Sequence, residues 1–553
     1  MSDKGGVVRQ DGRMDRRHSA SIGSHTVGAP ISTIPALVAD RARRYPDAVA
    51  VSGPLGRLSF AELAIEVQAA TRAAMASGIE PGDRVGMWAP NSVRWIVSAL
   101  GMLGAGATLV PISTRLRGPE VAEVLARSRA TAVCTVQTFL GNDYPAMLAD
   151  SGRELPALEH LILLDDSLGE SPAQWDISSW AGFLAPGTVI APDDAWARTD
   201  GIDPDSVCDI LFTSGTTGAP KGVLATHRQT LEVFAQWADA VTLRPRDRYL
   251  LVNPFSHTFG YKAGILACLL RTATMVPIER FDPDVALQLI ENERITVLAG
   301  PPTLFTDLLN AGYREYMLGS LRLAGTGGAT IPEELVDRIR EDLRVPYVFT
   351  AYGLTESIGV VSVCPPAAAT ELVAGTVGKA LPGTEIRIID RQGQPVITGA
   401  AGEITVRGPN VMLGYLDDPA ATAEAVDGEG FLHTGDVGTL DESGYLRITD
   451  RLKDMFIVGG FNAYPAEIER ILLQHPDIED VAVVGVPDER LGEVGRAVVV
   501  ATRGVTVDPA ALIAWSTTRL ASYKVPREVL FADSLPRNAG GKVNKASLRK
   551  PPA

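Results

Sequence analysis

A run of small, hydroxylated residues that ends in a lysine is the part of the sequence best suited to chemistry. Residues 213–222 read Thr-Ser-Gly-Thr-Thr-Gly-Ala-Pro-Lys-Gly, and an apolar run at 207–212 precedes them. Glycines let backbone N–H groups turn toward an anion, hydroxyls add donors, and Lys221 supplies a point charge. The spacing is not that of a Walker A loop. We therefore expect a phosphate-binding loop of another class, formed by Thr213, Ser214, Gly215, Thr216, Thr217, Gly218 and Lys221.

Composition and charge exclude several classes of protein. Lys and Arg number 51 and Asp and Glu 66, which gives a formal net charge of −15. This balance argues against a nucleic acid partner, which requires clustered basic residues. The 4 cysteines are far apart in the chain, so neither a disulfide framework nor a cysteine-based zinc site is expected. Buried reduced thiols and a cytoplasmic localisation are the simplest interpretation.

We expect no signal for export and no segment that spans a membrane. Residues 1–30 are polar and contain several arginines without a following apolar stretch, so residues 1–28 are interpreted as a mobile tail. Residues 95–114 carry no charge and are long enough to cross a bilayer. Their glycines, Pro111 and strand-like end favour a buried helix followed by a buried strand.

The elements that must position the candidate residues alternate along the chain. Between residues 60 and 350, helical patterns separate short apolar runs, which predicts βαβ units and a doubly wound α/β fold. From residue 375, short strands with Gly and Pro turns predict a small β-barrel-like part that ends near 452. Strands and helices then alternate in a smaller α+β pattern. We expect an N-terminal domain over 29–452 and a mobile C-terminal domain over 453–553.

Further short motifs follow the glycine-rich run in a defined order. They are GTGGA at 325–329, YGLTE at 352–356, HTGD at 433–436, DRLKD at 450–454 and PRNAGGK at 536–542. Each motif is weak alone. Together they resemble the adenylate-forming superfamily, which includes acyl-CoA synthetases, adenylation domains and beetle luciferases. The resemblance covers nearly the whole chain.

The resemblance implies an enzyme that uses ATP and Mg²⁺ to adenylate a carboxylic acid and then forms a thioester with CoA. By resemblance, Lys542 contacts the carboxylate and phosphate oxygens, whose crowded negative charge requires a cation. Glu356, next to Thr355, holds Mg²⁺. Asp436 accepts hydrogen bonds from the ribose hydroxyls, with Arg451 close by. The residues expected on the adenine side are Tyr352, Gly327, Gly328 and Ala329.

The second half-reaction implies a C-terminal domain that rotates. Lys453 resembles the family's hinge residue, which would absorb the rotation that replaces Lys542 in the site by Gly459 and Gly460. Backbone without side chains at these glycines would let the pantetheine arm of CoA pass, although a turn after a strand would also explain them. Lys524, in the run Tyr-Lys-Val-Pro, is a candidate for contact with a CoA phosphate.

The segment NPFSHTFGY at 253–261 bears on which acid the chain activates. His257 lies where the family often has an aromatic gate on the acyl pocket, and a satisfied interior histidine is an equal alternative. No Asp lies between Asn253 and Lys262, unlike in amino-acid-activating relatives, so a plain carboxylic acid is expected. This segment, 294–303 and the closing run resemble most the actinobacterial members that attach CoA to the C/D-ring propanoate left from sterol breakdown. A polycyclic acid of this kind is expected, with a terpenoid carboxylate as its rival.

Other functions remain compatible with parts of the pattern. The chain could load the thiol of a carrier protein, perform one half-reaction only, or be a catalytically silent binding protein. Retained Lys542, Glu356 and Asp436 argue against the silent protein. A homo-oligomer is compatible with the sequence, which does not decide the oligomeric state.

Overall fold

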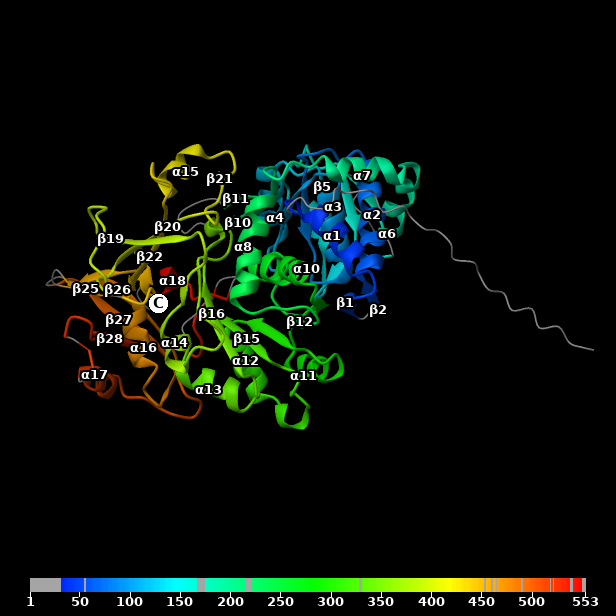
Figure 1. Cartoon of the computed structure of the whole chain (residues 1–553). Helices are drawn as coiled ribbons and strands as arrows, with labels where there is room; N and C mark the ends of the chain where they lie inside the picture. Colours follow the sequence, from blue (N-terminus) through cyan, green and yellow to red (C-terminus); the bar gives the residue numbers. More distant parts are fainter. Residues whose placement is uncertain are drawn as a thin grey trace, which may run out of the picture.

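Two large sheets flanked by helices form the body of the molecule. The computed structural model describes residues 31–53, 56–166, 175–213, 220–327, 331–451, 454–458, 461–463, 465–488, 491–517, 519–520, 522–537 and 541–549. Within these residues the chain is α/β with mixed sheets, as expected, and its C-terminal part is a separate α+β domain. Figure 1 shows the C-terminal elements, in orange to red, on one side of the molecule, next to the strands labelled β19, β20 and β22.

The first sheet has 8 strands and carries the start of the glycine-rich loop. Its inner strands pair in parallel, and the β10–β11 hairpin is antiparallel. In spatial order the strands are β21 (Gly414–Tyr415), β11 (Lys221–Thr226), β10 (Val207–Thr213), β4 (Thr108–Pro111), β3 (Arg84–Trp88), β5 (Ala132–Thr135), β8 (His160–Leu163) and β9 (Asp176–Ser178).

The second sheet has 9 strands, and its central strands are parallel. In spatial order they are β18 (Lys379–Ala380), β17 (Ser362–Val363), β16 (Tyr347–Tyr352), β15 (Leu323–Gly327), β14 (Val297–Gly300), β12 (Arg248–Leu251), β13 (Thr274–Pro277), β1 (Val49–Gly53) and β2 (Gly56–Ser59).

Helices of the two sheets share one large apolar core. Trp95 of α3 packs against Phe255 and Tyr261, with ring centroids 5.1 and 6.0 Å away. The main helices are α1 (Ile34–Arg44), α2 (Phe60–Ala76), α3 (Val93–Gly104), α4 (Gly118–Ser128), α7 (Pro192–Asp200), α8 (His227–Ala240), α11 (Pro283–Asn292), α12 (Pro302–Asn310), α13 (Glu333–Glu341) and α14 (Thr370–Gly375).

The uncharged stretch at 95–114 is a buried helix followed by a buried strand, as predicted. It contains most of α3 and all of β4, and nearly all of its side chains are buried. None of the helices among the described residues combines the length and the apolar character that a bilayer crossing requires.

Smaller sheets complete the fold. The strands predicted as β-barrel-like form an antiparallel sheet in the order β19 (Glu385–Ile389), β20 (Gly402–Arg407), β22 (Leu432–Leu440) and β23 (Leu446–Arg451). The C-terminal domain has its own core, which includes Phe456, Ile468 and Val499. Its elements are β24 (Phe456–Val458), β25 (Phe461–Ala463), α16 (Pro465–Leu472), β26 (Ile478–Asp488), β27 (Gly492–Ala501), α17 (Pro509–Thr517), β28 (Glu528–Phe531) and α18 (Lys545–Leu548).

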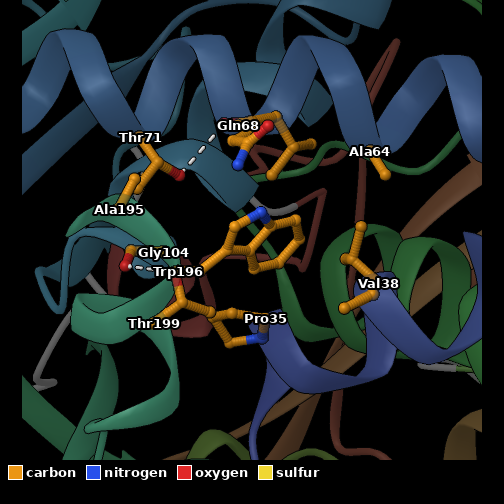
Figure 2. A pocket seen from close by; sticks show the side chains of 11 residues that line it. Pro35, Val38, Ala64, Gln68, Thr71, Gly104, Ala195, Trp196 and Thr199 are labelled. Carbon is orange, nitrogen blue, oxygen red and sulfur yellow. Dashed lines mark hydrogen bonds between the residues drawn. The ribbon is translucent and has the colours of Figure 1, made fainter. Parts of the chain in front are cut away.

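Two cavities lie away from the predicted site residues. One, of about 20 Å³, lies between α1, α2 and α7, where the ring of Trp196 packs between Gln68 and Pro35 (Figure 2). It is far smaller than a pocket for an acyl substrate, which needs about 300 Å³ or more. The other, of about 830 Å³, is lined by Arg84, Thr108 and their neighbours at the amino ends of β3 and β4. Ligands of such sheets bind at the carboxyl ends of the strands, so the site must be sought at the opposite edge.

Candidate active site

The glycine-rich loop begins and ends on the β10–β11 hairpin. Thr213, the last residue of β10, lies opposite Lys221, the first residue of β11, and the Thr213 hydroxyl donates to the Lys221 carbonyl at 3.4 Å. Ser214, Gly215, Thr216, Thr217 and Gly218 lie outside the described residues. The hairpin therefore fixes both ends of the predicted phosphate loop.

Tyr415 links Lys221 to Glu356. Its ring faces the Lys221 ammonium, with Nζ 4.8 Å from the ring centroid, and its hydroxyl donates to Glu356 Oε1 at 3.0 Å. Burial, and next the Glu356 carboxylate, raise the pKa of Tyr415, so this hydroxyl stays protonated and remains a donor. The sequence analysis missed Tyr415. In the sequence, Tyr415 is marked by nothing more than the glycine before it. The pairing of β21 with β11 is what brings Tyr415 to the site.

The Glu356 carboxylate fits a metal that is completed by substrate. Among the described residues no group of three or more His, Cys, Asp or Glu side chains is placed to hold an ion. Mg²⁺ is commonly bound by one or two carboxylates together with water and substrate phosphates. Glu356 follows Thr355 in a short 3₁₀ turn, and its Oε1 already accepts from Tyr415. This donor set suits Mg²⁺ better than an ion held by protein alone.

Tyr352 and Asp436 form a buried polar pair. The Tyr352 hydroxyl donates to Asp436 Oδ2 at 2.6 Å, and the residues are 8% and 3% exposed. Arg451 lies in register with Asp436 on the neighbouring strand β23. The structure thus brings together the predicted adenine-side tyrosine, the predicted ribose carboxylate and the backbone of the predicted ribose-side arginine.

Glu403, which the sequence analysis also missed, holds the irregular part of β22 before Asp436, where the register with β20 shifts. Its Oε1 accepts from the Gly435 N–H at 3.2 Å, and its Oε2 lies 3.1 Å from His433 Nδ1. Gly435 has φ of +68°, a left-handed conformation that favours glycine. A carboxylate on β20 therefore fixes the orientation of the HTGD motif.

The turn of the YGLTE motif packs tightly on the chain that follows it. A Cβ at Gly353 would clash with the carbonyl oxygen of Gly359. Gly327, at the end of β15, lies in register with Ala351 on β16. The carboxyl ends of these two strands are therefore adjacent at one edge of the second sheet. Gly328 and Ala329 lie outside the described residues.

His257 is exposed, although protein surrounds it. It is the N-cap of α9 (Thr258–Gly260), and its Nδ1 accepts from the Phe259 N–H at 3.1 Å. Desolvation, and next the charge of Lys542, lower the pKa of His257 to about 4, so the imidazole is neutral near pH 7. An accessible side chain that is also partly desolvated lies in a concave part of the surface. A satisfied interior histidine does not fit this exposure.

Two buried asparagines fix the segment before His257. Asn91 Nδ2 donates to the carbonyl of Asn253 at 2.9 Å, and Asn91 Oδ1 accepts from the Phe255 N–H at 2.8 Å. Asn253 Nδ2 in turn donates to the carbonyl of Ala299 at 2.8 Å. The sequence analysis did not identify Asn91, which lies far from this segment in the chain. These bonds hold His257 at the carboxyl ends of β12 and β14.

The C-terminal domain places its lysine next to the acyl side of the site. The charge of Lys542 acts on His257 although the two residues belong to different domains. Lys524 lies with its Nζ 5.5 Å from the centroid of the Tyr523 ring. Lys453, Gly459 and Gly460 lie outside the described residues. The charge of Lys542 is therefore felt at His257 across the boundary between the two domains.

The comparisons with known proteins agree with this geometry. The family model described as AMP-binding enzyme matches residues 38–416, and the model for the C-terminal domain of AMP-binding enzymes matches residues 467–542. The chain belongs to the AMP-binding enzyme family. The predicted resemblance to adenylate-forming enzymes is therefore confirmed.

Two relatives are similar over almost their whole length. One is a 3-[(3aS,4S,7aS)-7a-methyl-1,5-dioxo-octahydro-1H-inden-4-yl]propanoyl:CoA ligase from Mycobacterium tuberculosis, 47% identical over 94% of this chain and 99% of the relative. The other carries the same name, comes from Rhodococcus jostii, and is 46% identical over 94% of this chain and 98% of its own length. This chain is accordingly an enzyme that uses ATP to adenylate an acid and transfers the acyl group to CoA.

Solved structures show the same fold. ATP-bound MatB from Rhodopseudomonas palustris has a TM-score of 0.79 at 30% identity, over 93% of this chain and 98% of that one. An anthranilate CoA ligase in complex with anthranoyl-AMP has a TM-score of 0.82 at 25% identity, over 94% of this chain and 97% of that one. The expected fold and the expected class of acid–thiol ligase are confirmed.

Proposed function

We propose that this enzyme activates a polycyclic, keto-substituted propanoate of the steroid-ring type with ATP and Mg²⁺ and transfers it to CoA. The similarity to two ligases whose names specify an indane-dione propanoate supports the substrate class. The approach of Lys542 to His257 supports a conformation suited to the adenylation step. We place the reaction in the cytoplasm, where ATP and CoA are present and where four free, buried cysteines remain reduced.

In this proposal the N-terminal domain holds ATP before the acid reacts. The loop from Thr213 to Lys221 binds the phosphates through backbone N–H groups, hydroxyls and one ammonium. Asp436 accepts from the ribose hydroxyls, and its bond from Tyr352 fixes the orientation of the carboxylate. Glu356 binds Mg²⁺, which supplies charge neutralisation on the phosphates when it is present. Arg451 completes the ribose side.

Adenylation joins the acid to the α-phosphorus. A carboxylate oxygen forms a bond to phosphorus, and the bond to the pyrophosphate leaving group breaks. Lys542 offsets the negative charge that accumulates on the attacking and phosphate oxygens. His257 accepts through Nδ1, so its ring proton lies on Nε2, from which it donates to an oxygen of the acid. A neutral imidazole does this without adding charge to the site.

Thioester formation requires a second arrangement of the C-terminal domain. We assign Lys453 as the hinge, Gly459 and Gly460 as the backbone along which pantetheine passes, and Lys524 as a contact for a CoA phosphate. The thiolate of CoA attacks the acyl carbonyl, and AMP leaves. Rotation removes Lys542 from the site, where it is no longer needed.

A panel of acids separates this proposal from its rivals. We would measure pyrophosphate, AMP and acyl-CoA with an indane-dione propanoate, a bicyclic terpenoid acid, ferulate and a medium-chain fatty acid. The proposal expects the highest kcat/KM with the indane-dione propanoate and equal amounts of AMP and acyl-CoA.

Each other outcome identifies a different function. A preference for the terpenoid acid rejects the steroid-type substrate and keeps the ligase. Pyrophosphate without acyl-CoA indicates an enzyme of one half-reaction, and transfer to a phosphopantetheinylated carrier but not to CoA indicates carrier loading. Absence of all products from every acid indicates a silent binding protein.

A further inference from the structure

A buried ion pair lies behind the acyl side of the site, where no step described above uses it. Lys262 Nζ lies 2.9 Å from Asp209 Oδ1, and the two side chains are 1% and 0% exposed. The ammonium also donates to Thr230 Oγ1 at 3.4 Å, and Asp209 Oδ2 accepts from the thiol of Cys208 at 3.1 Å. The cluster is therefore polar, connected and shielded from water.

The cluster joins three elements that border the site. Asp209 lies in β10, the strand that ends at Thr213, where the phosphate loop begins. Lys262 lies in η2 (Tyr261–Leu266), a π-helical segment directly after the short helix that His257 caps. Thr230 lies in α8, which follows the other strand of the hairpin. The phosphate side and the acyl side are thus tied together in the interior.

Stability alone does not explain why charges are kept here. Two charges lose much of their hydration on burial, and replacing a buried ion pair by apolar side chains is often neutral or stabilising. The contact is also imperfect, because Asp209 Oδ1 and the ammonium are not aligned as a hydrogen bond. The neighbouring Tyr261 hydroxyl is buried without a hydrogen-bond partner among the described residues. Such an arrangement costs stability and fixes geometry.

We propose that Asp209 and Lys262 are a positioning pair for adenylation, which sets the distance between the segment that holds the acid and the strand that leads to the phosphate loop. The inference rests on the proposed function, in which His257 and this loop hold the two reactants. An error on the order of 1 Å in such a placement costs about 100-fold in rate. The π-helical turn at Lys262 is consistent with this role, since such turns occur frequently at functional sites.

The proposal predicts that loss of the ion pair affects the two half-reactions differently. Before adenylation the carboxylate and the α-phosphorus are separate, so their distance depends on the protein. After adenylation a covalent bond joins them, and the pair no longer matters. A loss confined to the first half-reaction therefore reports positioning, whereas general damage to the domain slows both.

The test removes both charges together. In D209N/K262M no charge is left buried without a partner, so we expect a folded enzyme. Acid-dependent exchange of pyrophosphate into ATP measures adenylation, and conversion of supplied acyl-adenylate to acyl-CoA measures the second step. We expect the exchange kcat to fall about 100-fold, while the KM for ATP and the second step change by about twofold or less. The acid used is the most active one of the panel, so a wrong substrate class leaves this test intact.

A second buried pair in the same domain provides the matched control. Asp247 and Arg322 form an ion pair with side chains 2% and 12% exposed, just before β12 and β15, at the amino ends of the strands. In D247N/R322M we expect a lower melting temperature and an unchanged exchange kcat. An exchange kcat in D209N/K262M within about threefold of wild type, or an equal loss of both half-reactions, overturns the proposal.

A milder variant covers the case in which D209N/K262M does not fold. K262R keeps a cation opposite Asp209 but replaces a compact ammonium by a longer planar group. We expect it to fold, to adenylate about tenfold more slowly and to retain the second step. Adenylation at the wild-type rate by K262R also overturns the proposal.

Discussion

The site is built from two regions with opposite character. On the N-terminal side, Asp436 is buried against the hydroxyl of Tyr352, and Glu356 accepts from Tyr415 across the sheet edge. On the C-terminal side, Lys542 is exposed and lies close to His257 from another domain. The first region is arranged before substrate arrives, because packing and hydrogen bonds fix it. The second contributes a charge that, in the proposed function, leaves the site before the thioester forms.

The largest expected effect comes from removing the mobile charge. We expect Lys542→Ala to reduce acid-dependent pyrophosphate release about 1000-fold, because one cation fewer offsets the charge of the transition state. Thioester formation from supplied acyl-adenylate should remain within about threefold of wild type, since the lysine leaves the site for that step.

Lys545 supplies the matched control for Lys542. It lies close by in the chain but pairs with Glu469 at 2.8 Å within the C-terminal domain. Lys545→Ala should leave pyrophosphate release unchanged. Equal loss of both half-reactions in Lys542→Ala would contradict the division into a fixed region and a mobile one.

A smaller effect is expected from the fixed region when one carboxylate is neutralised. Asp436→Asn keeps the shape of the side chain but replaces a charged acceptor by a neutral one. A hydrogen bond to a charged group contributes about 2 kcal/mol, so we expect the KM for ATP to rise roughly thirtyfold. Asp441→Asn, in the turn between β22 and β23, is the control, because this carboxylate accepts from the Ser443 and Tyr445 N–H groups of its own turn. An unchanged KM for ATP in Asp436→Asn would reject the ribose assignment.

A still smaller effect should follow from loss of a single hydroxyl. Tyr415→Phe keeps the ring that faces Lys221 but removes the hydrogen bond to Glu356. This bond contributes about 1 kcal/mol, so we expect kcat for adenylation to fall roughly fivefold. The Mg²⁺ concentration at half-maximal rate should shift as well, because Glu356 loses its fixed orientation. Tyr445→Phe is the control, because this ring lies outside the site, with its centroid 4.6 Å from Lys379 Nζ. A Tyr415→Phe enzyme with the kcat and Mg²⁺ dependence of wild type would show that the hydroxyl does not orient Glu356 for adenylation.

The last effect concerns stability rather than rate, and it tests the buried histidine. His227 is 1% exposed, accepts from the Ile34 N–H at 3.3 Å, and has its pKa lowered by burial to about 4. Unfolded histidine titrates at about 6.5, so the unfolded state binds more protons between these values, and the free energy of unfolding falls as the pH drops from about 6.5 to 4. Integrated over that window the loss reaches about 3 kcal/mol.

Urea unfolding between pH 7 and pH 4 measures this difference. His227→Asn should flatten the pH dependence by most of that amount, because it removes the group whose pKa is lowered on folding. A pH dependence left unchanged by His227→Asn would contradict the assignment of His227 as a histidine that is buried in its neutral form.

The sequence predicted the parts of the site that are local in the chain. The alternation of helices and strands, the buried strand that ends at the glycine-rich loop, and the buried helix and strand over 95–114 follow from periodicity and turn residues. The motif order predicted that Tyr352 and Asp436 belong to one site, although 84 residues separate them.

Contacts made only by the tertiary fold were not predictable in this way. Tyr415 reaches Glu356 through the pairing of β21 with β11, and Asn91 reaches Asn253 across 162 residues. The ion pair of Asp209 and Lys262 joins a strand to a π-helical turn, and no periodic pattern marks either residue. A single sequence indicates which residue types could do chemistry. It does not indicate which distant side chains hold them in place.

The four cysteines give the enzyme a practical property. All are free and buried, and burial raises the pKa of Cys134 to about 12. Thiolate is the form that reacts with disulfide reagents, so the native protein should be silent toward them. The CoA thiol that remains can therefore be titrated with a chromogenic disulfide in aliquots withdrawn from the reaction, without a contribution from the folded enzyme. In a separate sample without CoA, slow reaction of the protein thiols with the same reagent would report the rate at which the N-terminal core opens.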